Sequence, residues 1–322
     1  MLAYTFRRLL NTLPLLLGIT IICFLTIKLA PGDPIQLMTD LNPKAQANQA
    51  MKDQLGLNKP LHEQYLSWLS NLVQGNLGTS LAPDAKPVAQ KITEALPLTL
   101  WLNISGLALV LALSIPLGVW LSLRPGTTTD ATVTLLLLIG LAAPSVWLAL
   151  LGMQLFGVTL SLVPLSGLQT YGAEHWPWWQ RWPDILHHLA LPLAVGLIGG
   201  AAGITRFIRG SMIETLKADY ILTARAKGAS PRRVLWRHAL RNALLPVITI
   251  LGLSVPGLIG GSVILESLFA LPGMGNLFYT ATLMRDYPTI MALLTIGAVL
   301  TLLGNLLADL AIARADPRTI NK

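Results

Sequence analysis

Charged residues are scarce in this sequence of 322 residues. Asp, Glu, Lys and Arg make up only 12% of it, whereas 53% of its residues are hydrophobic. A soluble protein carries about 25% charged residues, because water must solvate most of its surface. The deficit therefore excludes an ordinary soluble protein and indicates a chain whose apolar surface faces lipid.

Cysteine and the sequence motifs of several enzyme classes are also lacking. Cys23 is the single cysteine, so no intrachain disulfide can form, and the five histidines have no zinc-site spacing. The sequence contains no G-x-x-x-x-G-K-[ST] loop for ATP phosphates, no G-x-S-x-G nucleophile turn and no H-E-x-x-H metal pair. We therefore expect no catalytic residue, no metal site and no enzyme activity in this chain.

Long apolar runs stand in place of the missing charge. A helix rises 1.5 Å per residue, so about 20 apolar residues cross a hydrocarbon core of about 30 Å. The runs lie at residues 9–30, 98–123, 133–156, 189–208, 247–265 and 290–312. They predict an all-α membrane protein with about six transmembrane helices. The first run is too long for the apolar part of a secretory signal, so we expect the mature protein to retain it.

The basic residues give the expected orientation. If the N-terminus is cytoplasmic, most of the 23 lysines and arginines fall in inside segments, chiefly between residues 206 and 241. Cytoplasmic loops of membrane proteins carry such an excess. We therefore expect both termini to be cytoplasmic. The same distribution accounts for the net charge of +8 without a nucleic-acid partner.

Two regions outside the apolar runs are expected on the other side of the membrane. Residues 31–96 are too polar to insert, and they contain helix-like stretches at 45–55 and 61–73. Residues 157–188 carry four tryptophans in a short stretch. Tryptophan beside a span is typical of the membrane interface, so an interfacial belt is the favoured reading, with a substrate or partner surface as the alternative.

Helix start and stop signals mark the basic region at 206–243. Residues 214–227 predict a helix, and Gly228 suits the left-handed residue that follows a helix end. Ser230 is a favourable N-cap and Pro231 a favourable first residue for a second helix. The sequence thus predicts helix, tight turn and helix at the inner membrane surface.

The turn itself is made of small residues, namely Ala224, Ala226 and Gly228. Such residues allow the surface of another protein to approach the backbone closely. An ordinary basic cytoplasmic loop is the alternative. Proton- or sodium-coupled carriers usually have charges near mid-span, whereas Lys28 and Asp309 lie near span ends. The chain therefore offers a path across the membrane, and any energy for transport must come from a partner.

At this loop the sequence resembles a known family. Asp219-Tyr220-Ile221-Leu222-Thr223-Ala224-Arg225-Ala226-Lys227-Gly228, followed by Arg237-His238-Ala239-Leu240-Arg241-Asn242-Ala243-Leu244-Leu245-Pro246, is similar to the cytoplasmic signature of dipeptide, oligopeptide and nickel ABC-transporter permeases. Further landmarks of that family appear in order: Pro31-Gly32-Asp33-Pro34, Leu55-Gly56-Leu57, Gly75-Asn76-Leu77-Gly78, Pro272-Gly273-Met274-Gly275, Arg285-Asp286-Tyr287-Pro288 and Asp316-Pro317-Arg318. The resemblance covers nearly the whole chain.

The resemblance implies the fold of a type I ABC importer permease in a bacterial inner membrane. Residues 1–93 would form the N-terminal transmembrane helix and a long periplasmic loop. Residues 94–313 would form a transmembrane core of five helices with the coupling loop at 206–243, and residues 314–322 a short cytoplasmic tail. Residues 266–275 and the loop at 31–96 would face an external solute-binding protein.

The resemblance also implies partners and a site. The partners are a second homologous permease subunit, two cytoplasmic ATPase subunits that bind ATP and Mg, the solute-binding protein and membrane lipid. The ATPase-coupling residues are then Asp219, Tyr220, Ala224, Arg225, Ala226, Lys227 and Gly228. The substrate stays open among dipeptides, oligopeptides, glutathione and nickel chelates. A secondary carrier or channel without an ATPase, and a membrane scaffold, are the competing functions.

Overall fold

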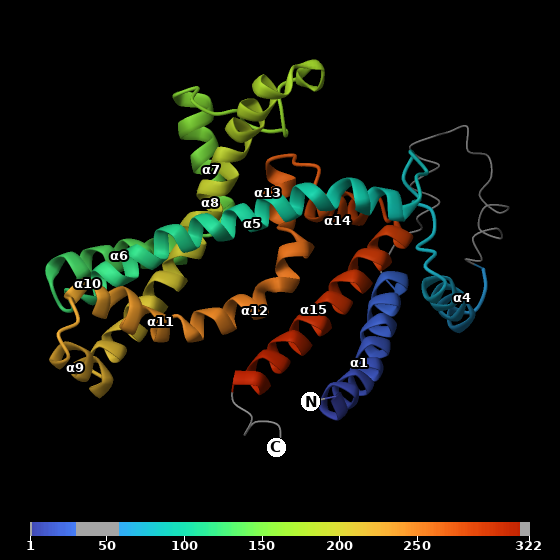
Figure 1. Cartoon of the computed structure of the whole chain (residues 1–322). Coiled ribbons are helices and arrows are strands. Elements are labelled where there is room, and N and C mark those ends of the chain that lie inside the picture. The colour runs from blue at the N-terminus through green and yellow to red at the C-terminus, as the bar shows by residue number, and fades with distance from the viewer. Residues whose placement is uncertain (1, 30–57, 316–322) are drawn as a thin grey trace. The chain divides into compact units, whose positions relative to one another are not determined.

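The computed structural model of the chain describes residues 2–29 and 58–315, and most of these residues are helical (Figure 1). Apart from helices, turns and loops, the described ranges contain one isolated antiparallel bridge, between Thr79 and Pro87. This architecture confirms the all-α prediction. The helix expected at 45–55 lies outside the described residues.

The elements follow one another along the chain without a sheet in the described residues. They are α1 (Leu2–Leu29), α4 (Leu61–Val73), α5 (Val88–Ser122), α6 (Thr128–Ala142), α7 (Ser145–Gly152), the π-helical turn η1 (Met153–Thr159) and the short 3-10 turn η2 (Ala173–His175). They continue with α8 (Trp178–Leu216), α9 (Asp219–Ala226), α10 (Pro231–Arg233), the π-helical turn η3 (Val234–Ala239), α11 (Leu240–Ala243), α12 (Leu245–Gly260), α13 (Val263–Leu268), α14 (Met274–Leu283) and α15 (Tyr287–Ala315). The stretch predicted at 61–73 is α4, with the expected bounds.

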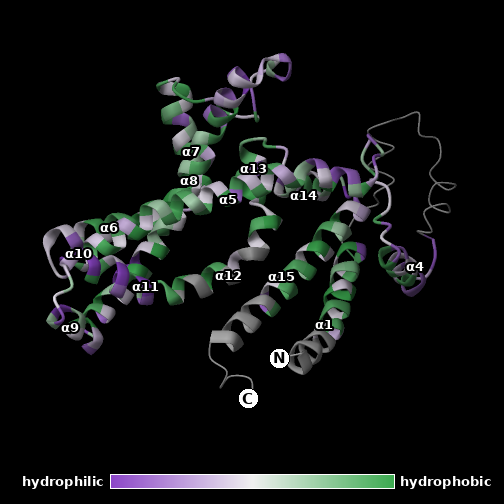
Figure 2. Ribbon diagram, viewed as in Figure 1, coloured by the Kyte–Doolittle hydropathy of each residue, from purple (hydrophilic) through white to green (hydrophobic). Residues whose placement is uncertain are grey.

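Four of the described helices are long and apolar enough to cross a membrane. They contain the segments Thr12–Leu29, Val88–Ser122, Trp178–Leu216 and Tyr287–Leu306. Figure 2 shows mostly hydrophobic residues along α5 after its first turns. Each of these helices contains most of one predicted apolar run, so the sequence located them correctly.

The predicted run at 133–156 forms a bent pair of helices instead of one straight span. Thr128–Ala142 and Ser145–Thr159 meet at 98°. Ala143 at the break is extended, with φ −72° and ψ 128°. Pro144 follows it, and proline disfavours the helical conformation in the residue before it. Counted as one span, the pair raises the number in the described residues to five.

The fifth predicted run, at 247–265, forms a shorter helix. α12 has 16 residues and ends at Gly260. Gly261 has φ +72°, a left-handed conformation that interrupts the helix before α13 begins. The six apolar runs therefore correspond to four straight spans, one bent pair and one helix that is shorter than a full span.

α8 is longer than its apolar run at both ends. The sequence predicted a span at 189–208, and the helix covers Trp178–Leu216. Apolar content identifies only the part of a helix that can lie in lipid, and polar turns can continue the same helix beyond it. The tryptophans at 178, 179 and 182 lie in its first turns, where they are exposed.

The chain divides into two compact units, and the boundaries between them fall within α5, α12 and α13 and in the loop before α14. In the unit formed by Met1–Leu100, Val255–Ser267 and Pro272–Lys322, α1 packs along α15 and α14 packs on α15. Its buried core cluster comprises Val88, Ile92, Ala95, Met274, Ala292 and Leu293. α4 lies against α1, where the Tyr65 and Phe24 rings meet edge to face at 5.4 Å.

The other unit, Trp101–Ser254 with Leu268–Leu271, is organised around α8. α6 and α7 pack on α8, as do η3 and α11. A buried core joins these elements and comprises Val119, Ile208, Met212, Ile221, Val234, Ala239, Leu240, Ala243 and Val247. This core includes residues of α5, α8 and α12 as well as of α9, η3 and α11, so the short helices are packed directly on the long ones.

Candidate functional site

The predicted helix at 214–227 is two helices, and the prediction of a single one is wrong. α8 ends at Leu216, and α9 begins at Asp219 after Ala218, which is extended at φ −72° and ψ 145°. The break redirects the chain so that the Ile221 side chain is fully buried in the core of this unit. Burying such a side chain contributes about 1.5–3 kcal/mol, which offsets the interrupted helix.

The turn after α9 has the geometry that the sequence predicted. Gly228 has φ +77°. Its N–H donates to the Arg225 carbonyl at 2.9 Å, and the Ala229 N–H donates to the Ala224 carbonyl at 3.1 Å. This pair of bonds is the Schellman motif, in which a left-handed residue lets the chain reverse while satisfying the last carbonyls of the helix. Gly228 therefore fixes where α9 ends.

The start of the next helical segment was also predicted correctly. The Ser230 hydroxyl accepts a hydrogen bond from the Arg233 N–H at 3.4 Å, and Pro231 is the first residue of α10. The segment continues through η3 and α11 to Ala243. The π-helical turn inside it was not predicted, because a pattern of apolar residues does not specify where one residue is inserted into a helix.

The seven predicted coupling residues lie together on α9 and its turn. Asp219, Tyr220, Arg225, Ala226, Lys227 and Gly228 are exposed, and Ala224 is partly buried. A Cβ added at Gly228 would meet no other atom within 4 Å. The surface is therefore an exposed knuckle, formed by residues 219–228, that rests on the single buried side chain of Ile221.

A hydrogen bond that sequence reasoning missed ties this knuckle to the following helix. The Asn242 side-chain amide donates to the Tyr220 hydroxyl at 2.8 Å. Both residues are part of the family-like signature, but their separation of 22 positions gives no hint that they meet. A long-range polar pair of this kind follows from tertiary packing, which a periodic pattern does not describe.

An ion pair within the same unit was missed as well. Arg209 of α8 donates from its Nε to Asp130 Oδ1 at 2.6 Å and from a terminal nitrogen to Asp130 Oδ2 at 2.5 Å. Asp130 lies in the first turn of α6, is almost fully buried, and accepts a further bond from the Gly126 N–H at 3.0 Å. In the sequence, Arg209 is one of many basic residues between positions 206 and 241. The available signal for this ion pair was Asp130, a carboxylate just before the apolar run at 133–156.

In the unit that contains α13–α15, a buried carboxylate organises the segment predicted to face a binding protein. Glu266 accepts hydrogen bonds from the Gly275 N–H at 2.7 Å, the Asn276 N–H at 3.2 Å and the Thr99 hydroxyl at 3.1 Å. A Cβ added at Gly273 would collide with Glu266 Oε2. Gly273 therefore makes room for this carboxylate, whereas Gly275 allows close approach of the Ser262 and Val263 backbone.

Asp286 performs a similar task at the start of α15. Its carboxylate accepts from the Ser80 hydroxyl at 2.5 Å, the Leu81 N–H at 2.9 Å and the Thr289 hydroxyl at 2.6 Å. It is buried, and it joins the loop before α5 to the first turn of α15. Asn76 caps the same loop by accepting from the Gly78 N–H at 2.9 Å. The landmarks at 75–78 and 285–288 therefore contain residues that hold the loop before α5 in place.

No group of three or more His, Cys, Asp or Glu side chains is placed to hold a metal ion within residues 2–29 and 58–315. In that part of the chain the two histidines at the start of the fourth predicted span bond to the backbone. His187 Nε2 lies 2.6 Å from the Leu162 carbonyl, and His188 Nδ1 lies 2.9 Å from the Asp184 carbonyl.

Two family models together match almost the whole chain. Residues 114–321 match "Binding-protein-dependent transport system inner membrane component", and residues 1–103 match "Binding-prot-dependent transport system membrane comp, N-term". Oligopeptide transport system permease protein AppB of Bacillus subtilis is 45% identical over 318 residues, 99% of each chain. Glutathione transport system permease protein GsiC is 36% identical in Pectobacterium atrosepticum and 35% identical in Salmonella typhimurium, over 317 residues and 98% of each chain.

Proposed function

Since the chain belongs to the family of inner membrane components of binding-protein-dependent transport systems, we propose that it is the permease subunit of an ATP-binding-cassette importer driven by separate ATPase subunits. The family is one of transport permeases of the bacterial inner membrane, and the chain is a multi-pass member of it. The observation that carries the proposal is the exposed knuckle at 219–228, which is packed on a core shared by α5, α8 and α12.

The knuckle has the properties of a docking element. Its outer residues are exposed, its turn contains the small residues Ala224, Ala226 and Gly228, and the space around Gly228 is open. Arg225 and Lys227 give it positive charge. We propose that the seven coupling residues seat in a cleft of a cytoplasmic ATPase, which places both termini of the chain in the cytoplasm.

The core beneath the knuckle supplies the mechanical link. Ile221 of α9 lies in one buried cluster with Ile208 and Met212 of α8, Val119 of α5 and Val247 of α12. Because protein interiors are close-packed, a displacement of α9 is passed to the helices that it touches. We propose that ATP binding in the partner moves α9, and that α5, α8 and α12 follow as a two-state switch between outward- and inward-facing cavities.

The other partners follow from the same assignment. We propose a second homologous permease, two ATPase subunits that bind ATP and Mg, and an external solute-binding protein that meets residues 266–275 and the loop at 31–96. In this scheme residues 1–93 form the N-terminal helix and periplasmic loop, and residues 94–313 the transmembrane core. α8 also carries Gly196, Gly199 and Gly203, and Cβ atoms added at these positions would meet nothing within 4 Å. Small residues let two helices approach closely, so we propose that another subunit packs against this part of α8.

The proposed substrate is a peptide or a similar small solute. The relatives are named as oligopeptide and glutathione permeases, and a peptide backbone with charged ends is common to both. We expect the solute-binding protein to select among dipeptides, longer peptides, glutathione and nickel chelates.

Site-directed labelling tests the placement of the knuckle. In a Cys23→Ser background, a cysteine replaces Ala226 of the knuckle or Tyr171, a fully exposed residue between η1 and η2. A membrane-impermeant maleimide added to intact cells should label the position at 171 and leave that at 226 unlabelled until the cells are opened. Labelling of position 226 from outside would overturn the assignment.

Co-purification tests the energy source. The affinity-tagged chain, expressed with the genes adjacent to its own, should bring down two ATPase subunits and a second permease, and vesicles of the complex should take up solute only with internal ATP. A chain that purifies alone and takes up solute on an ion gradient would instead be a secondary carrier.

A further inference from the structure

The helical segment that follows the knuckle, residues 231–243, has two very different sides. Val234, Ala239 and Ala243 are buried in the core of their unit. The opposite side is exposed and carries Arg232, Arg233, Trp236, Arg237 and Arg241. One side of the segment is therefore packed on the protein, and the other side exposes basic and aromatic residues. The proposed coupling function does not involve this exposed side.

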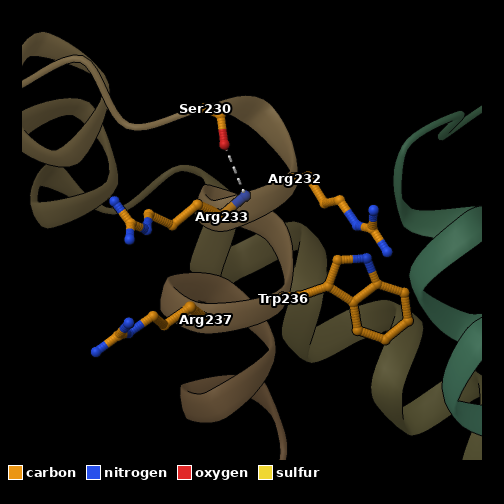
Figure 3. A pocket seen from close by; sticks show the side chains of 5 residues that line it. All are labelled: Ser230, Arg232, Arg233, Trp236 and Arg237. Atoms are coloured by element: carbon orange, nitrogen blue, oxygen red, sulfur yellow. Dashed lines mark hydrogen bonds between the residues drawn. The ribbon is translucent and has the colours of Figure 1, made fainter.

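Part of that surface is hollowed. A depression of about 580 Å³ is lined by Ser230, Arg232, Arg233, Trp236 and Arg237. Figure 3 shows the guanidinium of Arg232 extending toward the indole of Trp236, while Arg233 and Arg237 extend together on the other side of the helix. Ser230 is engaged by its bond from the Arg233 N–H, so the arginines are the groups left to bind a ligand.

These arginines have no acidic partner within residues 2–29 and 58–315. No salt bridge there involves Arg232, Arg233 or Arg237, whereas Arg209 in the same unit is paired with Asp130. Three like charges within six residues repel one another. A phosphate group would relieve that repulsion, because the planar guanidinium donates two parallel bonds to phosphate oxygens.

The aromatic residue among the charges narrows the choice of ligand. Trp236 is 46% exposed. A small free anion would leave this apolar surface in water. At the boundary between lipid and water, by contrast, an indole is favourably placed, since its apolar ring and its N–H suit the two environments.

The position along the chain points to the same boundary. The segment leads directly into the apolar helix α12, whose first residue, Leu245, is 60% exposed. A basic segment immediately beside a membrane helix lies at headgroup depth, where anionic lipids attract it. We propose that the hollow binds the phosphodiester headgroup of an anionic phospholipid, with Arg233 and Arg237 on the phosphate, Arg232 on the opposite side of the headgroup, and Trp236 beside the glycerol and upper acyl chains.

Retention of lipid by the purified full-length chain tests the proposal. Native mass spectrometry in detergent would compare dioleoyl phosphatidylglycerol with dioleoyl phosphatidylcholine. The wild-type chain should retain the first and not the second. The hollow variant, Arg232→Gln with Arg233→Gln and Arg237→Gln, should bind phosphatidylglycerol roughly a hundredfold more weakly, because each basic residue near the membrane contributes about a fivefold effect.

A matched control removes the same charge elsewhere. Arg124→Gln, Arg206→Gln and Lys217→Gln replace three exposed cations that lie outside the hollow and outside the knuckle, and this variant should bind phosphatidylglycerol as the wild type does. Each single substitution within the hollow should weaken binding roughly fivefold, which keeps the test available if the triple variant does not fold. Trp236→Leu keeps every charge. This variant should retain phosphatidylglycerol more weakly than the wild type does but should still prefer it to phosphatidylcholine.

Four results would overturn the proposal. They are equal retention of the two lipids, undiminished phosphatidylglycerol binding by the hollow variant, equal loss in the control variant, and binding of water-soluble glycerophosphoglycerol as tight as that of the lipid. A hollow variant that keeps the lipid but no longer co-purifies with ATPase subunits would assign these arginines to an acidic protein surface instead. The lipid measurement needs no ATPase, so it stands or falls independently of the coupling function.

Discussion

The Asn242 side chain holds the Tyr220 ring in place by donating a hydrogen bond of 2.8 Å to its hydroxyl. The bond connects the first turn of α9 with α11, and so it orients the knuckle relative to the helical segment that follows. Together with the burial of Ile221, it gives the short helix two points of attachment.

Removing that bond should loosen the knuckle. We expect Tyr220→Phe to lower the free energy of unfolding by about 0.5–1.5 kcal/mol and to reduce the solute transported per ATP hydrolysed. Asn242→Ala should have the same effect, and the double variant should be no worse than either single one, because both remove one interaction. Thermal unfolding and coupled transport assays in proteoliposomes would check this, and fully additive losses would contradict it.

The size of the residue at 228 should matter only in the assembled complex. Gly228→Trp places a large side chain in open space, so we expect membrane insertion to persist while ATP hydrolysis is uncoupled from transport. Gly228→Asn is the control, since asparagine tolerates the left-handed conformation and is much smaller than tryptophan. The left-handed backbone costs most residues about 1–2 kcal/mol. Normal transport by the tryptophan variant would refute the coupling role.

Breaking the ion pair between α6 and α8 should destabilise the chain strongly. Arg209→Gln leaves the buried Asp130 carboxylate without its partner, and we expect a loss of about 3–5 kcal/mol. Adding Asp130→Asn should recover much of that loss, because no unpaired buried charge then remains. Unfolding curves of the two single variants and the double variant form the required cycle. A double variant that is less stable than either single one would contradict this account.

The Glu266 carboxylate should be irreplaceable by its amide. In Glu266→Gln one oxygen that accepts from backbone N–H groups becomes an NH2 group, so at least one charge-assisted bond is lost, at about 1.5–3 kcal/mol. Glu214→Gln, at an exposed position of α8, should change stability by less than about 0.5 kcal/mol. Differential scanning fluorimetry of the purified chain would measure both. We also expect the Glu266 variant to lose transport stimulation by the solute-binding protein, since the surrounding segment would be displaced.

Local signals in the sequence predicted local structure well. The apolar runs located the long helices, because a membrane imposes one simple length requirement on them. Gly228, Ser230 and Pro231 predicted their turn, because each residue acts on the backbone within a few positions of itself. α4 was likewise found at 61–73.

The sequence was less informative where distant parts of the chain determine the result. The break at Ala218 follows from the burial of Ile221 in a core formed by other helices, and no signal near Ala218 announces it. The pairs of Asp130 with Arg209 and of Glu266 with Thr99 span 79 and 167 positions. The 98° bend was readable in principle from Pro144, but its angle depends on packing.

The brevity of α9 has a consequence for anyone who wishes to inhibit the transporter. A helix of eight residues cannot persist in water alone, because isolated helices shorter than about 12–15 residues are marginal. A synthetic peptide with the sequence of the knuckle would be mostly unfolded in water. It would therefore bind the knuckle's partner weakly and compete poorly with the intact protein. A chemically cross-linked analogue, with its termini bridged to imitate the anchorage that Ile221 provides, is the form in which this short sequence could serve as a drug lead.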